Sequence, residues 1–295
     1  MCNNLLDCYS TTVERIFTPQ LGDIIMIIDM HSHIFPEKIA SRALDKLSSI
    51  IKIPPSMNGT ISGLMDSMEK SGVDLSVVLP VVTSPSQFDS ILHFAVWINE
   101  TASSWNGPKL LSFGGIHPES SNYKEQLRSI AREGIRGIKI HPNYQGVSFD
   151  DIRYMRIIDT ASELGLTVLT HAGEDAYTPG EEYCSPDMIL HVLKDVAPPR
   201  LVLAHMGNNE HYNESEEKLC GQKVYLDTSY SIMHMSEEQF VRMIHIHGAD
   251  RILFGTDAPW TSQKDCVQKL SRMTGLSQME KQQILGGNAS ILLNL

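Results

Sequence analysis

Two histidines that are separated by one residue mark the first place where this sequence could do chemistry. His31 and His33 stand after an apolar run that starts at Asp23 and continues through Ile28. A short run of β-branched residues between polar ones is typical of a buried strand. Side chains alternate across a strand, so the two imidazoles point to the same side. A pair of imidazoles placed in this way can hold one metal ion.

Polar residues of similar chemistry stand at or just after the ends of five later apolar runs. They are His117, Lys139, His141, His171, His205 and Asp257. Because these residues are far apart in the sequence, they can share one site only if the strands that carry them lie side by side. The elements between them decide whether that is so.

Eight short apolar runs alternate with stretches of helical periodicity. The runs are residues 23–28, 74–82, 110–116, 135–140, 166–170, 200–204, 224–227 and 251–255. This alternation predicts parallel strands joined by helical crossovers. Eight such units in about 270 residues have the size of an α/β fold of one domain, the closed (β/α)8 TIM barrel, here over residues 23–295. An open doubly wound sheet is the rival, but it seldom needs eight regular units, and no G-x-G-x-x-G motif follows the first strand.

Local signals mark the ends of several predicted helices. Apolar residues recur at helical spacing between Ile61 and Met68, and Gly72 closes that helix. Ser185 followed by Pro186 has the residue types preferred at the N-cap and the first helical position. These signals support helices as the connections between the strands.

The carboxyl ends of the strands share one face in a closed barrel, and that face hosts the active site. The polar residues after the runs are therefore expected to converge there. Four of them form a nitrogen-rich ligand set with one carboxylate: His31, His33, His171 and Asp257. Such a set suits Zn²⁺ best, with Mn²⁺ or Fe²⁺ as alternatives. The sequence thus predicts a centre for one divalent metal ion.

Two residues beside the predicted metal could move protons. A bound divalent ion lowers the pKa of its water to about 7 and generates hydroxide at neutral pH. Asp257 could accept a proton from that water. His205 is the second acid/base candidate, and it could also polarise a carbonyl oxygen.

Three further residues are predicted to bind the substrate. Lys139 and His141 are one strand period apart, so both could face the barrel mouth. Lys139 would pair with a substrate carboxylate or, if carbamylated, would bridge two metal ions. His141 fits a pocket wall and a structural role equally well. Trp260 is a candidate platform for the substrate, although an aromatic residue after a strand belongs more often to the core.

The other histidines are interpreted as structural. His117 precedes Pro118 in a turn, where it would cap the strand or line the pocket wall. Six more lie away from strand ends: His93, His191, His211, His234, His245 and His247. A single histidine in such a place is more often a structural residue than a ligand. The metal prediction therefore depends on the ordered set and not on any one histidine.

The ordered set resembles the amidohydrolase superfamily over nearly the whole chain from residue 26 onward. Its motifs are His31-x-His33 after the first strand, then His171, His205 and Asp257 after the fifth, sixth and eighth. Three phrases are similar to the branch that contains aminocarboxymuconate semialdehyde decarboxylase and related metal-dependent hydrolases (amidohydrolase family 2): Gly137–Pro142, Phe254–Trp260 and Gly286–Ala289. The resemblance implies a mononuclear site. In it His31, His33, His171 and Asp257 bind the metal, and His205 works beside them as acid/base.

The fourth strand separates this chain from some relatives of that superfamily. Related metal-dependent deoxyribonucleases have a glutamate there that bridges two metals, whereas this chain reads Lys139-Ile140-His141. That difference disfavours a nuclease of the same type. Other members of the superfamily have a carbamylated lysine on this strand, so carbamylation of Lys139 stays an alternative. A substrate contact or a structural role for Lys139 is favoured over it.

Three hypotheses for function follow from these residues. The first is a metal-dependent hydrolase of a small-molecule amide, lactone or ester. The alternative is a non-oxidative decarboxylase of a small carboxylic acid at the same site, because the branch contains both kinds of enzyme. The third is a metal-binding barrel without catalysis, which the presence of both His205 and Asp257 disfavours. The loop after the first strand and residues 174–185 are expected to form much of the specificity wall.

Composition narrows the partners and the compartment. The formal net charge of −11 argues against sequence-independent nucleic-acid binding, which needs lysine and arginine to neutralise phosphates. No apolar run approaches the length that spans a membrane. Five cysteines, an odd number without C-x-x-C spacing, disfavour a disulfide framework and predict a reducing cytoplasm. The expected partner is a small-molecule substrate, and the resemblance allows a homodimer.

Residues 1–22 are polar and have no clear period. They are predicted to form an N-terminal extension, either disordered or helical, without the basic start and apolar middle of a signal peptide. A third interpretation is that they are not native and that Met26 is the true start, because a stretch that resembles a ribosome-binding site can encode residues 21–23.

Overall fold

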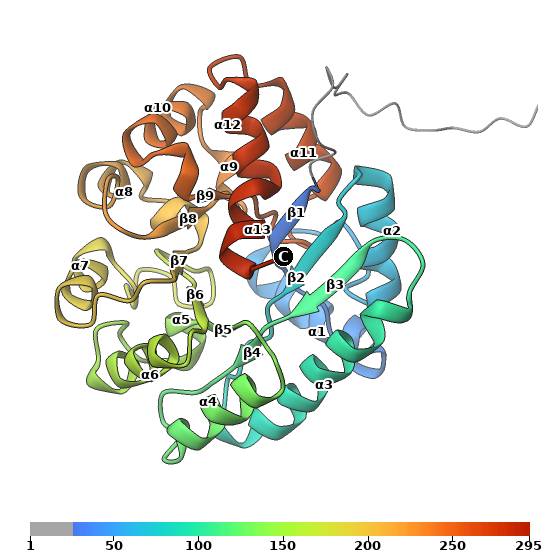
Figure 1. Ribbon diagram of the computed structural model, residues 1–295, viewed down its shortest axis with the longest axis vertical. Coiled ribbons are helices and arrows are strands. Elements are labelled where there is room, and N and C mark those ends of the chain that lie inside the picture. The colour runs from blue at the N-terminus through green and yellow to red at the C-terminus, as the bar shows by residue number, and fades with distance from the viewer. Residues whose placement is uncertain (1–25) are drawn as a thin grey trace, which may run out of the picture.

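Short parallel strands form a ring in the computed structural model, which describes residues 26–295, and helices surround that ring (Figure 1). Each strand pairs in parallel with its neighbour along the chain within two sheets, β1 to β3 and β4 to β9. The strands are β1 (Ile28–Ser32), β2 (Leu75–Val78), β3 (Lys109–Ser112), β4 (Gly114–Gly115), β5 (Gly137–Ile140), β6 (Thr167–Thr170), β7 (Leu201–Leu203), β8 (Tyr225–Asp227) and β9 (Ile252–Leu253). The predicted N-terminal extension and the first residues of the first predicted strand lie outside the described part of the chain.

β3 and β4 occupy one position of the ring, because they are consecutive and only Phe113 separates them. Lys109 of β3 pairs with β2, and Gly114 of β4 pairs with β5. The third predicted strand, residues 110–116, is therefore present but interrupted. Counted in this way, the described strands fill the eight positions that the sequence predicts.

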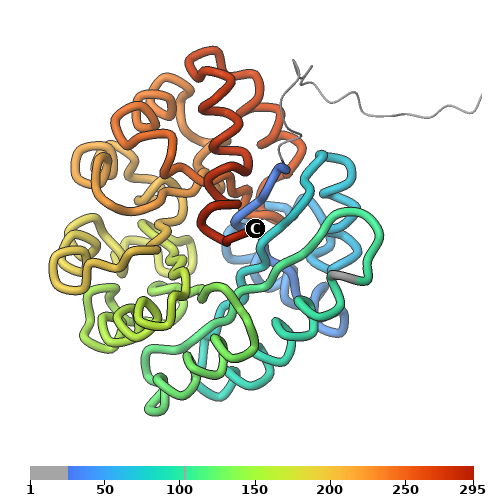
Figure 2. The backbone as a smooth tube through the Cα atoms, viewed as in Figure 1, coloured from blue at the N-terminus to red at the C-terminus, as the bar shows by residue number. Residues whose placement is uncertain are grey.

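Backbone hydrogen bonds close the ring between its first and last strands. The amide of Met30 donates to the carbonyl of Phe254 over 2.8 Å, and the amide of His33 donates to that of Ala258 over 2.6 Å. In the other direction, the amide of Asp257 donates to the carbonyl of His31 over 2.8 Å. The chain passes once around the ring, so its first and last elements meet (Figure 2). The predicted (β/α)8 barrel of one domain is confirmed, and the open sheet is excluded.

Helices follow most strands, as the periodicity predicts. They are α1 (Glu37–Ile51), α2 (Ile61–Ser71), α3 (Phe88–Thr101), α4 (Tyr123–Arg132), α5 (Pro142–Gln145), α6 (Ile152–Glu163), α7 (Pro186–Asp195), α8 (Tyr212–Lys218), α9 (Ser231–His234), α10 (Glu237–His247), α11 (Gln263–Arg272), α12 (Gln278–Gln282) and α13 (Asn288–Leu293). Local signals operate as expected: the Ser185 hydroxyl accepts from the amide of Met188 at the start of α7, and Gly72 is left-handed after α2.

The core has two layers. The larger layer lies between the strands and the surrounding helices. The smaller layer fills the barrel and includes the fully buried Met30, Val77, Phe113 and Leu253. Because apolar side chains pack the interior, the barrel is a solid core rather than a pore. Polar side chains that point inward can therefore collect only at its end.

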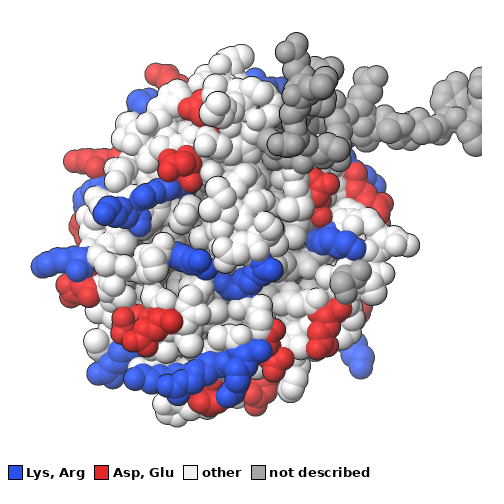
Figure 3. Space-filling model, viewed as in Figure 1, with Lys and Arg blue, Asp and Glu red and all other residues white. Residues whose placement is uncertain are grey.

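On the face seen in Figure 3, groups of lysine and arginine lie beside groups of aspartate and glutamate. Within residues 26–295, no helix combines the length and the apolar character needed to cross a membrane. Among the described cysteines, Cys184, Cys220 and Cys266 are free thiols.

Gly137 at the start of β5 leads to a stability prediction, because a side chain there has no room. An added Cβ would lie 2.5 Å from the ring of Phe113 and 2.6 Å from the carbonyl oxygen of Thr167. We expect Gly137→Ala to reduce the free energy of unfolding by about 1–3 kcal/mol, which chemical denaturation would measure. Gly287→Ala is the matched control, because its Cβ would meet nothing closer than 3.5 Å. Equal stability of the two variants would contradict this packing.

Candidate metal centre

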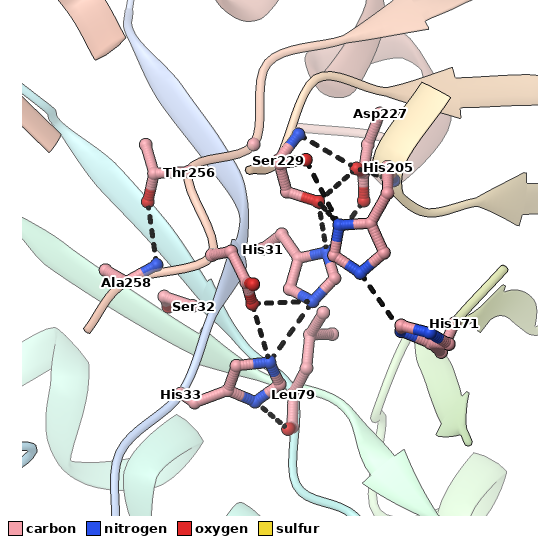
Figure 4. A network of polar contacts seen from close by, with 12 residues as sticks. His31, Ser32, His33, Leu79, His171, His205, Asp227, Ser229, Thr256 and Ala258 are labelled. Atoms are coloured by element: carbon pink, nitrogen blue, oxygen red, sulfur yellow. Dashed lines mark hydrogen bonds and ion pairs between the residues drawn. The ribbon is translucent and has the colours of Figure 1, made fainter. Parts of the chain in front are cut away.

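Three predicted ligands converge at the end of the barrel. The Nε2 atoms of His31 and His33 lie 3.1 Å apart. The Oδ1 atom of Asp257 lies 3.2 Å from Nε2 of His33 and 3.5 Å from Nε2 of His31. His31 lies in β1 and His33 directly after it (Figure 4). Asp257 comes from the segment after β9 that hydrogen-bonds to β1. Barrel closure therefore brings the first and last motifs of the sequence to one point.

In each ring, the partner of Nδ1 determines whether Nε2 carries a proton or a lone pair. Nδ1 of His31 lies 2.8 Å from Oδ2 of Asp227, and Nδ1 of His33 lies 2.9 Å from the carbonyl oxygen of Leu79. Both partners are acceptors, so each Nδ1 carries the proton and donates. Each Nε2 is then a lone pair that faces the other imidazole and the Asp257 carboxylate. Three lone-pair donors face one another.

Such an arrangement repels itself unless positive charge lies close to all three donors. The Lys139 ammonium group lies 3.3 Å from Nε2 of His31, and a metal ion could contact all three. Burial and the neighbouring charge of Lys139 lower the pKa of His31 well below its usual value, so a proton on that ring does not supply the positive charge at pH 7. Burial alone would raise the pKa of Asp257, but beside the imidazoles it stays below the usual range. Neutral imidazoles and an ionised carboxylate are the ligand forms that a divalent metal requires. The residues present therefore fit a metal ion.

His171 stands in a neighbouring cluster rather than in the group of three. Its Nδ1 lies 3.1 Å from Nε2 of His205, whose ring in turn lies 5.2 Å from that of His31. Ligand atoms of His171, His141 and Asp175 lie within 4.8 Å of one another and form a second candidate metal group in the described chain. The structure thus brings together three of the four predicted ligands. The fourth, His171, is separated from them by His205. Its role as a ligand stays a prediction.

His171 and His205, which contact each other, are both neutral at pH 7. Burial and the charge of Lys139 lower the pKa of His171 to about 3. Burial and the neighbouring His171 lower the pKa of His205 to about 4. Nδ1 of His205 lies 3.1 Å from the carbonyl oxygen of Ser229 and donates to it, which leaves its Nε2 toward the site (Figure 4). His205 is thus held in one orientation, as a group that handles protons must be.

Lys139 supplies a buried ammonium group beside the three ligands. Its Nζ lies 3.3 Å from Nε2 of His31, and burial lowers its pKa to about 8. The position on β5 is the one that the strand period predicts. A substrate contact and a carbamylated bridge both fit this place, so the role of Lys139 stays a prediction.

A large cavity opens above the cluster and has a volume of about 960 Å³. Lys139, His141 and Trp260, which the sequence predicts to bind the substrate, all line it. So do parts of the two loops that the sequence expects to form the specificity wall, residues 34–36 and 174–177. His117 is not among the lining residues, and its Nδ1 instead accepts from the amide of Glu119 in a turn. Of its two expected roles, a cap after the strand and a part of the pocket wall, the hydrogen bond fits the first.

The sequence reasoning missed the residues that orient the site from behind. Asp227 at the end of β8 is fully buried and accepts hydrogen bonds from Nδ1 of His31 and the amides of His205 and Ser229. The Ser229 hydroxyl also hydrogen-bonds to Asp227. The available signal was an acidic residue at the end of an apolar run, the same signal that identified Asp257. Asp175 and Tyr230, which also line the cavity, left no comparable pattern.

A family model and several solved structures are similar to this chain. The model described as Amidohydrolase matches residues 28–295. A search of the curated proteins found no match. Similar solved structures include 5-carboxyvanillate decarboxylase from Sphingomonas paucimobilis, with 14% identity, a TM-score of 0.68 and coverage of 92% of this chain and 99% of that one.

Two more solved structures have the same fold. A dihydroxybenzoic acid decarboxylase from Polaromonas, with bound manganese and an inhibitor, is 16% identical with a TM-score of 0.68, and the match covers 92% of this chain and 97% of that one. A TIM-barrel protein from Bordetella bronchiseptica, described as uncharacterized, is 19% identical with a TM-score of 0.71, and the match covers 91% and 98%. Identities this low show the shared fold.

Replacement of Asp227 tests whether it prepares His31 as a ligand. In Asp227→Asn an amide NH₂ can replace the oxygen that accepts from Nδ1 of His31, which favours the tautomer without a lone pair on Nε2. We expect metal affinity to fall by about 10- to 100-fold, the usual effect of removing a partner behind a ligand. Competition with a chromophoric chelator would measure this change.

The control for that experiment is Asp45→Asn on the exposed side of α1. This variant makes the same chemical change away from the cluster, and its metal affinity should equal that of the unchanged protein. An unaltered affinity in Asp227→Asn would show that the tautomer of His31 does not depend on this carboxylate.

Proposed function

The chain belongs to the amidohydrolase family, and from this premise we propose that it is a metal-dependent, non-oxidative decarboxylase of a small carboxylic acid. The sequence reasoning placed hydrolysis first and decarboxylation second. The solved neighbours favour the second, because most of those with a stated activity are decarboxylases of small aromatic acids. The order of the two hypotheses is therefore reversed.

The observation that carries the proposal is the convergence of His31, His33 and Asp257 on one point beside the Lys139 ammonium group. In a decarboxylation, the bond between the carboxylate and its neighbouring carbon breaks and carbon dioxide leaves. The electron pair stays on that carbon, which then takes a proton. The reaction needs positive charge near the substrate oxygens and a group that can pass a proton to the carbon. Lys139 and His205, which line this cavity, support the two roles.

The proposed roles follow from position. His31, His33, His171 and Asp257 would hold the metal, which when bound supplies a Lewis acid that polarises substrate oxygens. Lys139 would face the substrate carboxylate or a neighbouring anionic oxygen. Asp257, which is ionised, and His205, which is neutral, would each take a proton from water or from a substrate hydroxyl and pass it to the substrate carbon.

The surroundings of the cluster favour loss of a carboxylate. Much of the cavity wall is aliphatic or aromatic, including Ile34, Phe35, Leu79 and Trp260. Apolar surroundings stabilise the concentrated charge of a carboxylate poorly. They disfavour the more dispersed charge of the breaking bond less, so the barrier to bond breaking falls. The wall thus supports decarboxylation more than a reaction that must admit water.

The metal, the compartment and the assembly are part of the same proposal. Zn²⁺ suits two or three imidazoles with one carboxylate, and Mn²⁺, which the Polaromonas enzyme binds, is the next candidate. We propose a reducing cytoplasm because Cys184, Cys220 and Cys266 are free thiols. A homodimer remains the predicted assembly of this branch.

Hydrolysis of an amide, lactone or ester is the second candidate function. The observation that favours it is the depressed pKa of Asp257, because an ionised carboxylate at neutral pH is ready to accept a proton from water. The same cluster would serve both reactions. The two functions differ in their products.

Product analysis distinguishes the two reactions. We expect the metal-loaded protein to release carbon dioxide from a member of a panel of hydroxylated aromatic acids, without net addition of water. A chelator should abolish the release, and added Zn²⁺ or Mn²⁺ should restore it. Mass spectrometry in ¹⁸O-water would detect the alternative: ¹⁸O in the product of a lactone, ester or amide, with no carbon dioxide, would establish hydrolysis and overturn the first proposal.

His205 and Asp257 can be tested on whichever substrate is turned over. We expect His205→Gln to lower kcat by about 10²- to 10⁴-fold, the usual contribution of a positioned acid or base, while metal binding persists. Asp257→Asn should abolish turnover. His93→Gln, on the exposed side of α3, is the matched control and should leave kcat unchanged. Undiminished turnover in His205→Gln or Asp257→Asn would show that the proton has another carrier.

A further inference from the structure

α1 has one broad apolar face, which consists of two adjacent rows of residues. Only Ala40 and Leu44 are buried among its fifteen residues, and they mark its inner side. A second row, at the spacing of one helix face, consists of Ile39, Ala43, Leu47 and Ile50. All four line the cavity above the metal cluster. We call this row the α1 stripe.

α3 and the segment after β2 present apolar side chains to the same cavity. Ile91 and Phe94 of α3 line it, and so does Val81. Phe94 is itself stacked against Trp97, with ring centroids 6.1 Å apart. The stripe and these residues form walls of one outer section of the cavity.

The ionisable groups of the cavity are distributed unevenly. The inner section contains Lys139, Asp175, Asp257 and the histidines of the cluster. Among the lining residues contributed by α1 and α3, Lys46 is the one charged side chain. The cavity therefore has a polar floor and a largely apolar outer section.

The volume exceeds the need of a single-ring substrate. A cavity of about 150 Å³ holds one benzene molecule, whereas this cavity measures about 960 Å³. A ring at the metal cluster would leave the outer section without an apolar partner. Ile39 keeps 39% of its surface exposed there. Aliphatic surface that faces a concave space next to a polar site is typical of a ligand pocket.

We propose that the substrate is an amphipathic organic acid, with its polar end at the metal cluster and an extended alkyl or aryl group against the α1 stripe. The proposal rests on the proposed function for the polar end only. A second copy of this chain fits the site less well, because protein interfaces cover about 800 Å² per partner, whereas the stripe lines the wall of a cavity.

The experiment uses straight-chain alkanoates from butanoate to dodecanoate as probes of the metal-loaded protein. Isothermal titration calorimetry measures their dissociation constants without any turnover. Each buried methylene should tighten binding by about threefold to fourfold until the outer section is filled. Removal of the metal with a chelator should weaken all probes by a common factor, because they share the carboxylate.

Two variants locate the apolar group. Leu47→Gln and Ile50→Gln should flatten the dependence on chain length and leave butanoate binding nearly unchanged. Ile291→Gln makes the same kind of change on α13, where the side chain is 75% exposed, and should leave the whole series unchanged. Circular dichroism of the variants checks that each one folds.

Three results would overturn the inference. The first is a dissociation constant that does not depend on chain length, and the second is a dependence that the stripe variants leave intact. The third is a change of molar mass in Ile50→Gln with an unaltered chain-length series, which would assign the stripe to a second copy of the chain. If chain length matters but no acid is decarboxylated, the proposed function fails and this inference stands.

Discussion

The hydrogen bonds that close the barrel between β1 and the segment after β9 determine the geometry of the whole site. They pair His31 with Asp257 and His33 with Ala258 through backbone atoms. The Asp257 side chain is thereby held against two imidazoles that lie more than two hundred positions away in the sequence. Asp257 also adopts a left-handed backbone, with φ of 66°, which few residue types tolerate. The segment after the last strand thus turns sharply at Asp257, and the hydrogen bonds that close the barrel hold that turn in place.

Two buried carboxylates beneath the cluster reinforce this arrangement. Asp227 receives donors from β1, from the segment after β7 and from its own loop. Asp29 receives the amides of His31 and Thr256 and the side chains of Thr256 and Gln263. Burial raises the pKa of Asp29 to about 6 despite these donors. Buried carboxylates cost stability unless they are well satisfied, so their presence indicates that orientation of the ligands outweighs that cost.

The sequence predicted which strand ends meet but not how their side chains are oriented. Strand periodicity placed His31 and His33 on one side, and the order of motifs placed Asp257 beside them. It could not show that His171 contacts His205 and groups with Asp175, because ring orientation depends on partners from other strands. It also missed Asp227, because an acid at a strand end looks the same whether it holds a metal or holds a ligand in place. The interruption of the third strand at Phe113 was equally invisible, since residues 110–116 read as one apolar run.

Chemistry and specificity have separate structural sources in this molecule. The polar floor consists of residues at strand ends, which the barrel holds rigidly and which decide what bond can break. The outer section depends on α1, a helix with few buried side chains, and on α3. A helix so lightly anchored can change its lining residues without disturbing the strands, because little of the core depends on it. Substitutions in the α1 stripe would therefore change which acid is accepted and leave the reaction itself unchanged.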